Sequence, residues 1–246
     1  MSHFSAQAKF YAEFRPDYPA ALVEFIADSV PEHNLAWDCG TGSGQAAVGL
    51  AEPFDRVIAT DISPEQIANA KPHNKVEYRV AAAEQSKLPD HSADVVTITQ
   101  ALHWLNMPRF YEEVRGVAKP LAVFVATVYS DPVLDDPRMD AILYNYNKVI
   151  VGPYWPPERK IVDAAYADIP FPFEELKTPN LKMEREWSLT ELAGYLRSWS
   201  ATTRYTKQKG IDPVIAFEAE IAHVWKNPSQ KQRLHWPFKI RAGRVS

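Results

Sequence analysis

The chain has 246 residues, of which 46% are hydrophobic and 24% are charged, and these proportions are typical of a globular protein rather than a disordered one. The formal charge of −4 gives no electrostatic basis for binding the phosphates of nucleic acids. A single cysteine excludes an internal disulfide framework, and no apolar run is long enough for export or for spanning a membrane, so we expect a cytoplasmic protein.

Strand and helix patterns alternate along the first half of the chain. Amphipathic or well-capped segments predict helices at 15–30, 45–52, 63–71 and 107–119. Short apolar runs between them predict strands at 34–40, 56–61, 75–84, 93–101 and 121–129. Five strands that alternate with helices predict an α/β fold with a doubly wound parallel sheet.

The second half of the chain has a different pattern. From Ser130 to about Pro172 the sequence is rich in proline and tyrosine, and we interpret it as an insertion or lid after the fifth strand. A sixth strand is expected at 181–188, helices at 189–199 and 213–226, and a last, antiparallel edge strand at 235–243. We therefore expect one domain over 1–246, with substrate-specificity insertions at 130–175 and 188–230.

A glycine-rich turn follows the first predicted strand in "LAWDCGTGSGQAA". Gly40, Gly42 and Gly44 are three of only nine glycines in the chain. Their spacing does not match the dinucleotide fingerprint, the P-loop or the nucleophile elbow. Asp38 precedes them, and a carboxylate at this place would repel a pyrophosphate but favour a ligand that carries an ammonium group.

Two further strand ends complete the predicted ligand. Asp61 ends the second strand, where a carboxylate can accept both hydroxyl groups of a ribose. Ala83 and Glu84 lie at the end of the third strand and can border the edge of an adenine ring. An ammonium group, a ribose and an adenine together describe S-adenosylmethionine.

The segments "DCGTGSG", "ATDIS", "AAAEQSKLP" and "DVVTITQALHW" resemble the class I S-adenosylmethionine-dependent methyltransferases. The segment "YAEFRPDYP" is similar to one in the small-molecule branch that contains trans-aconitate methyltransferase-like proteins. The resemblance implies a Rossmann-like sheet of seven strands, mostly parallel, with one antiparallel edge strand. It also implies cofactor contacts for Tyr11, Asp38, Gly40, Gly42, Gly44, Asp61, Ile62, Ala83, Glu84 and Gln100. One departure is the absence of the family's usual glycine before strand five in "AKPLAVFV".

Four residues are candidates for contact with the substrate: Arg15, Tyr18, His103 and Trp104. Arg15 and Tyr18, together with Tyr11, fit a cap over the cofactor pocket, in which Arg15 holds a carboxylate. Alternatively, "FRPDYP" is a clamp at a helix start, with Arg15 paired to Asp17. His103 is a candidate catalytic base or substrate donor, although a histidine at this place also fits a simple helix start.

The resulting hypothesis is O-methylation of a small carboxylate or phenol. A carboxylate needs no base, whereas a phenol or an amine would make His103 the first candidate for the proton. The alternatives are an N- or C-methyltransferase of a small metabolite and a non-catalytic module that only binds the cofactor. We expect no metal site, no nucleic acid or membrane partner, and a monomer or weak dimer.

Overall fold

The computed structural model describes residue 16 and residues 18–245, and these residues form two compact units. The predicted sites Tyr11 and Arg15 lie outside the described residues. The first unit, called the sheet unit below, contains the described residues 18–129, 161–181 and 238–245. The second, called the helical unit, contains 130–160 and 182–237. None of the helices in the described ranges is both long and apolar enough to cross a membrane.

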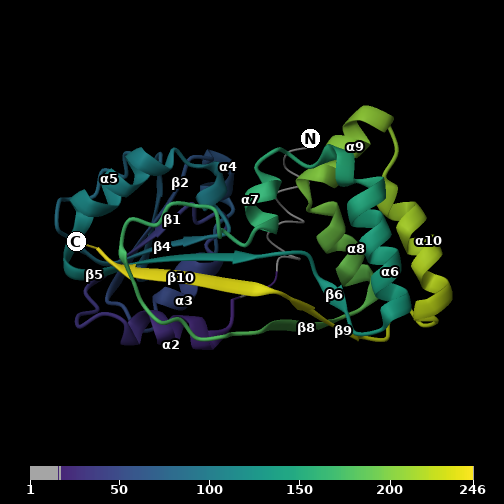
Figure 1. Ribbon diagram of the computed structural model, residues 1–246, viewed down its shortest axis with the longest axis horizontal. Helices are drawn as coiled ribbons and strands as arrows, with labels where there is room; N and C mark the ends of the chain where they lie inside the picture. Colours follow the sequence, from purple (N-terminus) through teal and green to yellow (C-terminus); the bar gives the residue numbers. More distant parts are fainter. Residues whose placement is uncertain (1–15, 17, 246) are drawn as a thin grey trace. The chain divides into compact units, whose positions relative to one another are not determined.

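The sheet unit contains a seven-stranded sheet in the order β3-β2-β1-β4-β5-β10-β7. Strands β1 to β5 are parallel, whereas β10 runs antiparallel to both β5 and β7 (Figure 1). The predicted α/β fold with a mostly parallel seven-stranded sheet is therefore confirmed. The strands are β1 (Leu35–Cys39), β2 (Arg56–Asp61), β3 (Val76–Val80), β4 (Ala93–Thr99), β5 (Ala118–Tyr129), β7 (Glu174–Glu175) and β10 (Phe238–Arg244).

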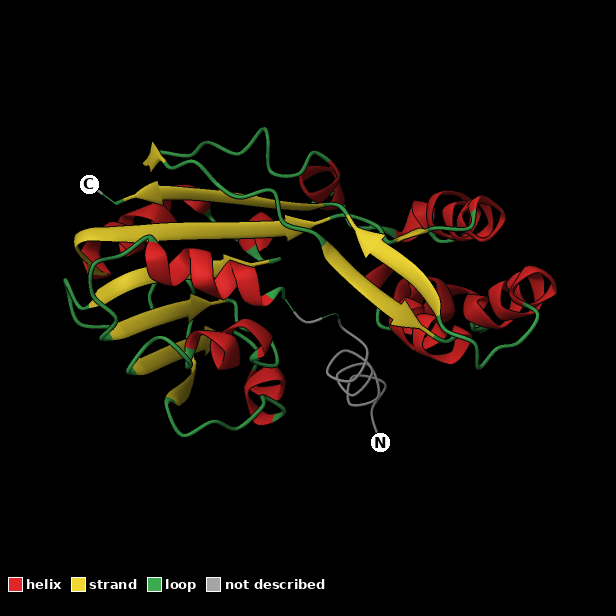
Figure 2. Ribbon diagram, turned by 90° about the horizontal axis from the view of Figure 1, so that it is seen from below, coloured by secondary structure: helices red, strands yellow, loops and turns green. Residues whose placement is uncertain are grey.

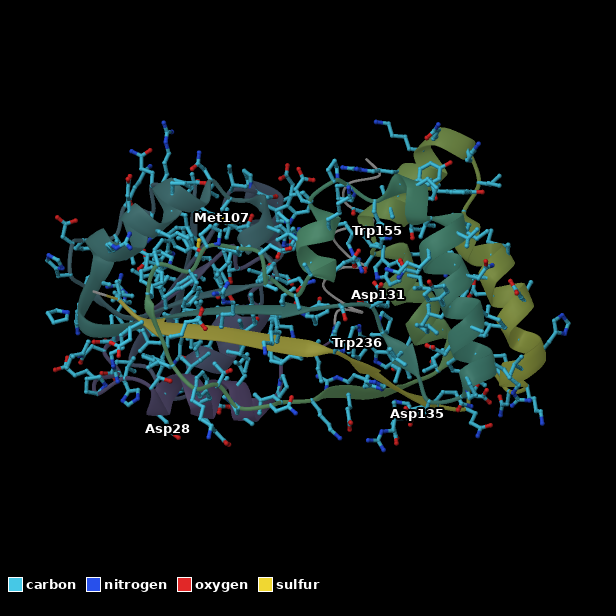
Figure 3. The ribbon with its side chains drawn as sticks, viewed as in Figure 1. Asp28, Met107, Asp131, Asp135, Trp155 and Trp236 are labelled. Atoms are coloured by element: carbon cyan, nitrogen blue, oxygen red, sulfur yellow. The ribbon has the colours of Figure 1, made fainter. Side chains whose placement is uncertain are left out.

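Helices cover both faces of this sheet. On one face, α2 (Ala20–Asp28) and α3 (Gln45–Leu50) bury apolar side chains together with alternate residues of the strands. On the other face, α5 (Met107–Val117) does the same, so that its first residue Met107 and the last residue of α2, Asp28, lie on opposite sides of the sheet (Figure 3). The unit also holds α4 (Pro64–Ala68) and the 3₁₀ turn η1 (Leu102–Trp104). Helix α7 (Arg159–Asp163) begins in the last two residues of segment 130–160, and its other three residues belong to the sheet unit.

Several predicted helix starts are confirmed by their caps. The hydroxyl of Ser63 accepts the amide hydrogen of Gln66 at 3.2 Å, and Pro64 occupies the first turn of α4. The side chain of Asn106 caps α5 in the same way through the amide of Arg109. These side chains satisfy amide hydrogens that have no partner inside the helix, which is why both helices begin there.

The C-terminal strands differ in detail from the prediction. The prediction of a single strand over 235–243 is wrong, because Pro237 divides this stretch between β9 (Gln232–Trp236) and β10. Proline has no amide hydrogen for a strand ladder, so the chain changes sheets at this residue. The expected sixth strand at 181–188 forms as β8 (Met183–Trp187), which pairs with β9 in a second sheet.

The helical unit is built around that second sheet, of order β6-β9-β8, which Figure 2 shows as a group of yellow strands beside helices. Its core contains the rings of Trp187, Tyr195, Trp199 and Trp236, and the centroids of neighbouring rings lie 5.1–5.7 Å apart. Its remaining elements are β6 (Val133–Leu134), α6 (Pro137–Asn145), η2 (Tyr146–Ile150), η3 (Gly152–Tyr154), α8 (Leu189–Arg197), α9 (Ser200–Lys209) and α10 (Pro213–Trp225).

Candidate functional site

The sheet face under α2 and α3 changes from apolar to polar toward the carboxyl ends of its central strands. Ala36 of β1 and Val95 of β4 belong to the apolar core on this face. Because side chains alternate along a strand, Asp38 and Thr97 lie on the same face two residues further on. The polar end of this face is where ligands bind in sheets of this class.

Asp38 is fully buried beneath the glycine turn. Thr41 Oγ1 donates to Asp38 Oδ2 at 2.6 Å, and Thr97 Oγ1 donates to Asp38 Oδ1 at 2.8 Å. Burial raises the pKa of Asp38 to about 6, although these two hydroxyls and the amide of Ala47 favour its charged form. Asp38 thus ties the turn to β4 and to the start of α3. A contact of Asp38 with a ligand ammonium group stays a prediction.

All three glycines of the turn have positive φ angles: +64° at Gly40, +56° at Gly42 and +82° at Gly44. A Cβ atom on Gly40 would lie 2.7 Å from the Cβ atom of Ala101, and one on Gly44 would overlap the phenol of Tyr78. The turn therefore needs glycine at these two places for its conformation and for close contact with other parts of the protein. Ser43, also in the turn, has a buried hydroxyl without a hydrogen-bond partner among the described residues.

Asp61 faces the glycine turn from the end of β2. Its Oδ2 accepts the amide hydrogen of Gly42 and its Oδ1 accepts that of Ser63, both at 2.9 Å. The carboxylate is half-buried, and the next side chain, Ile62, is 75% exposed. The structure thus places a fixed carboxylate beside an exposed aliphatic side chain. The contacts of Asp61 with a ribose and of Ile62 with an adenine ring stay predictions.

The residues after β3 lie at the same edge. Ala83 is buried, and Oε1 of Glu84 accepts the amide hydrogen of Asn106 at 2.9 Å, just before α5. Burial raises the pKa of Cys39 well above its usual value, and the charges of Asp38, Asp61 and Glu84 raise it further. Cys39 is therefore a neutral thiol, and the three carboxylates create a negative potential at this edge of the sheet.

The side chain of Gln100 forms two hydrogen bonds with the backbone of Tyr129. Its Nε2 donates to the carbonyl oxygen of Tyr129 at 3.0 Å, and its Oε1 accepts the amide hydrogen of Tyr129 at 2.8 Å. The Gln100 side chain thus joins the end of β4 to the end of β5. Its backbone has a φ of +56°, which is unusual for a residue other than glycine. The predicted contact of Gln100 with the methionine part of the cofactor is not tested by these bonds.

His103 lies in η1, directly after β4, and is buried against Tyr166. Its Nδ1 is 2.9 Å from Tyr166 Oη. Its ring centroid lies 4.7 Å from that of Trp104, with the two rings tilted by 45°, and Trp104 is half exposed. No sequence pattern in "DAAYADI" indicated Tyr166, which comes from a segment 63 residues further along the chain.

The remaining predicted substrate residue, Tyr18, packs on the α2–α3 face. Its ring centroid lies 6.5 Å from that of Tyr129 and 6.3 Å from that of Phe238. Tyr18 also lines a pocket of about 360 Å³ between α2 and α3, whose inner wall includes Thr97 and Thr99 of β4. The pocket thus reaches the polar end of the sheet face.

Comparisons with known proteins identify relatives of this chain among the methyltransferases. A family model described as a methyltransferase domain matches residues 37–126. A candidate methyltransferase from Dictyostelium discoideum is 33% identical over 234 residues, which cover 94% of this chain and 89% of that protein. A candidate S-adenosylmethionine-dependent methyltransferase from Saccharomyces cerevisiae is 23% identical over 245 residues, covering 85% and 84% of the two chains. A candidate type II methyltransferase from Anaeromyxobacter dehalogenans superimposes with a TM-score of 0.87 at 42% identity, covering 94% of this chain and 98% of that one.

Proposed function

Because this chain belongs to the class I methyltransferase family, we propose that it transfers a methyl group from S-adenosylmethionine to an oxygen of a small carboxylate or phenol. The observation that carries the proposal is the arrangement at the ends of β1 and β2. There the amide of Gly42 holds Asp61 in place, and the apolar side chain of Ile62 is exposed beside it.

The residues present fit this cofactor. The glycine turn has a left-handed backbone, which glycine adopts easily because it has no Cβ atom. The hydroxyl of Ser43 in this turn has no hydrogen-bond partner among the described residues. The negative potential of Asp38, Asp61 and Glu84 favours a ligand with sulfonium and ammonium charges over a phosphate. We assign Asp61 to the ribose hydroxyls and Ile62 to the adenine face.

When bound, S-adenosylmethionine supplies an electrophilic methyl carbon on a positively charged sulfur. The protein then has to orient the acceptor and exclude water, since the thioether leaves readily. Trp104 exposes an aromatic ring next to His103, at the end of β4, and such a ring can stabilise a sulfonium cation. The resemblance to trans-aconitate methyltransferase-like proteins favours an organic acid as the acceptor, and the net charge of −4 disfavours nucleic acid.

Calorimetric titration with S-adenosylmethionine and with its demethylated product tests cofactor binding. We expect Asp61→Ala to weaken both affinities about 10- to 100-fold, because two hydrogen bonds to the ribose are lost. The matched control is Asp55→Ala, which removes an exposed carboxylate just before β2. Unchanged affinity in correctly folded Asp61→Ala would contradict the assignment.

Turnover needs a separate measurement. We expect formation of the demethylated cofactor when the protein is incubated with a panel of small carboxylates and phenols. Methylation of amine or carbon acceptors alone would show an N- or C-methyltransferase instead. Tight cofactor binding without turnover on any acceptor would identify a non-catalytic binding module.

A further inference from the structure

We propose that Gln100 is a positioning residue for methyl transfer, which acts through the turn that it forms with Ala101 and directs the exposed ring of Trp104 toward the reacting methyl group. This inference rests on the proposed function, in which the ring of Trp104 stabilises the sulfonium cation. It is carried by three hydrogen bonds of Gln100 and by the contact of Ala101 with the glycine turn.

The first observation is the way in which the pairing of β4 with β5 ends. The pairing is regular up to Thr99, which lies opposite Thr127. Gln100 comes next, and its backbone amide donates to the carbonyl oxygen of Thr127 at 2.9 Å, as in a parallel ladder. In a continued ladder the backbone carbonyl of Gln100 would accept the amide hydrogen of Tyr129. That amide donates to Oε1 of the Gln100 side chain, at 2.8 Å.

The side chain of Gln100 thus takes the place of its own peptide group in the ladder. A carboxamide has the same kinds of donor and acceptor as a peptide, and its Nε2 also donates to the carbonyl oxygen of Tyr129 at 3.0 Å. The backbone of Gln100 can therefore leave the strand direction, with a φ of +56°. This conformation is unfavourable for a residue with a Cβ atom, so the bonds to Tyr129 are needed to hold it.

The turn at Gln100 places the next residue against the glycine turn. A Cβ atom on Gly40 would lie only 2.7 Å from the Cβ atom of Ala101, so the methyl group of Ala101 packs on bare backbone. Ala101 also begins η1, because its carbonyl oxygen accepts the amide hydrogen of Trp104 at 3.1 Å. The start of η1 is therefore fixed relative to Gly40, one of the predicted cofactor contacts.

The directions of the side chains in η1 follow from this start. Leu102 and His103 are 1% and 8% exposed, whereas Trp104 is 54% exposed. A displaced η1 would move the ring of Trp104 with it, because the ring is attached to a turn of only three residues. A displacement of about 1 Å in a group that orients the reactants can cost about 100-fold in rate. Gln100 thus acts on methyl transfer through Trp104, without touching the reacting atoms.

NMR couplings across hydrogen bonds test the ladder in the unmodified protein, without any need for activity. We expect the amide nitrogen of Tyr129 to couple to the side-chain carbonyl carbon of Gln100. Coupling to the backbone carbonyl carbon of Gln100 would show a regular ladder and would overturn the proposal. Because this measurement needs no variant, it gives a decision even if substitutions at Gln100 prevent folding.

Fluorine NMR of protein labelled with fluorinated tryptophan tests whether Gln100 directs Trp104. The chain has seven tryptophans, and Trp104→Phe identifies the signal of Trp104 by its loss. Gln100→Met keeps an unbranched side chain but loses both bonds to Tyr129, and we expect it to shift or broaden the Trp104 signal. The matched control is Gly210→Ala, which strains a positive φ in the helical unit and should leave that signal in place. An unmoved signal in Gln100→Met, or an equal change in both variants, would overturn the proposal.

Binding and turnover of Gln100→Met distinguish positioning from contact with the cofactor. We expect the affinity for S-adenosylmethionine to stay within about threefold of the unmodified protein. The rate of methyl transfer should fall about 10- to 100-fold. A loss of affinity as large as the loss of rate would make Gln100 a cofactor contact and would overturn the proposal, as would an unchanged rate.

A double variant tests whether Gln100 acts through Trp104. If it does, the two residues belong to one unit and their effects on the rate are not additive. We expect Gln100→Met to cost less than about threefold in rate when it is added to Trp104→Ala. The full loss of 10- to 100-fold in that background would show that Gln100 acts by another route.

Failure of the proposed function is distinguishable from failure of this inference. If the cofactor does not bind, or if it binds and no acceptor is methylated, the proposed function fails and the role of Gln100 in methyl transfer fails with it. The coupling between Tyr129 and Gln100 and the fluorine signal of Trp104 then still decide whether Gln100 directs η1.

Discussion

Substitutions at three glycines of this chain can distinguish the effect of backbone conformation on stability from the effect of steric space. Gly44 has a positive φ and contacts Tyr78, Gly210 has a positive φ with open space around it, and Gly116 has neither constraint. We expect Gly44→Ala to lower the free energy of unfolding by about 2–4 kcal/mol and Gly210→Ala by about 1–2 kcal/mol. Gly116→Ala should leave it unchanged or raise it by up to about 1 kcal/mol.

Urea unfolding of the three variants checks this order. Equal losses for Gly44→Ala and Gly210→Ala would show that the contact with Tyr78 contributes nothing. A lower free energy of unfolding in Gly116→Ala would contradict the role of helix propensity in α5.

The buried carboxyl of Asp38 predicts a specific dependence of stability on pH. Its folded pKa of about 6 lies above the usual value of 3.8, so the folded protein binds this proton more tightly than the unfolded chain does. The free energy of unfolding should therefore fall by up to about 3 kcal/mol as the pH rises from 4 to 6, and should then level off. Asp38→Asn lacks this contribution, so the stability difference between the two proteins should change over that range. A constant difference would contradict the raised pKa.

If Asp38 faces the ammonium group of the cofactor, the affinity for the cofactor should depend on whether Asp38 is charged. Binding of a cation favours the charged carboxylate, so the affinity for S-adenosylmethionine should rise as the pH increases through about 6. Calorimetry at several pH values measures this, with Asp38→Asn as the comparison. The same pH dependence of the affinity in both proteins would contradict a contact between Asp38 and the ammonium group.

Individual site residues were predictable to different degrees. Asp38, Asp61 and the glycines follow from their places at strand ends, and the structure does bring them together. Thr97 was predictable as well, because the alternation of Val95 and Thr97 on a buried strand indicates a polar position. Tyr166 was not, since a turn with two left-handed residues has no sequence signature and depends on Arg241 from β10.

The ends of β4 and β5 are joined by one side chain, which gives a prediction for these two strands. Gln100→Ala removes both hydrogen bonds to the backbone of the buried Tyr129 and should cost about 1–3 kcal/mol. Gln100→Gly loses the same bonds but relieves the positive φ, so its loss should be smaller by roughly 0.4–1 kcal/mol. Thermal unfolding of both variants tests this, and an equal or larger loss in Gln100→Gly would contradict it.

Among the helices and strands, the parallel core was predictable because β1, β2 and β4 are short, mostly apolar runs and because α4 and α5 have clear caps. The start of α6 carried a readable signal too, since Asp136 caps it and Pro137 occupies its first turn. In contrast, β7 has only two residues, both glutamates, and forms through its pairing with Gly243 and Arg244. Such a strand is defined by its partner, so no local pattern predicts it.

The assembly of the sheet unit depends on the last residues of the chain. All seven residues of β10 pair with β5, and Ile240 and Ala242 fill the core under α2 and α3. We expect a chain that ends at Pro237 to lose cooperative unfolding and to aggregate, because the edge of β5 becomes exposed. A chain that ends at Arg244 keeps β10 and is the matched control. Circular dichroism and size-exclusion chromatography compare the two, and a monomeric, cooperative protein ending at Pro237 would contradict the prediction.

The order of the strands also has a consequence for synthesis on the ribosome. About a hundred residues separate the end of β5 from the start of β10, its neighbour in the sheet. At ordinary translation rates, roughly 5–20 seconds pass between the emergence of these two strands. The nascent polypeptide therefore carries an open, apolar strand edge during that interval, and molecular chaperones that shield such edges should increase the yield of native protein.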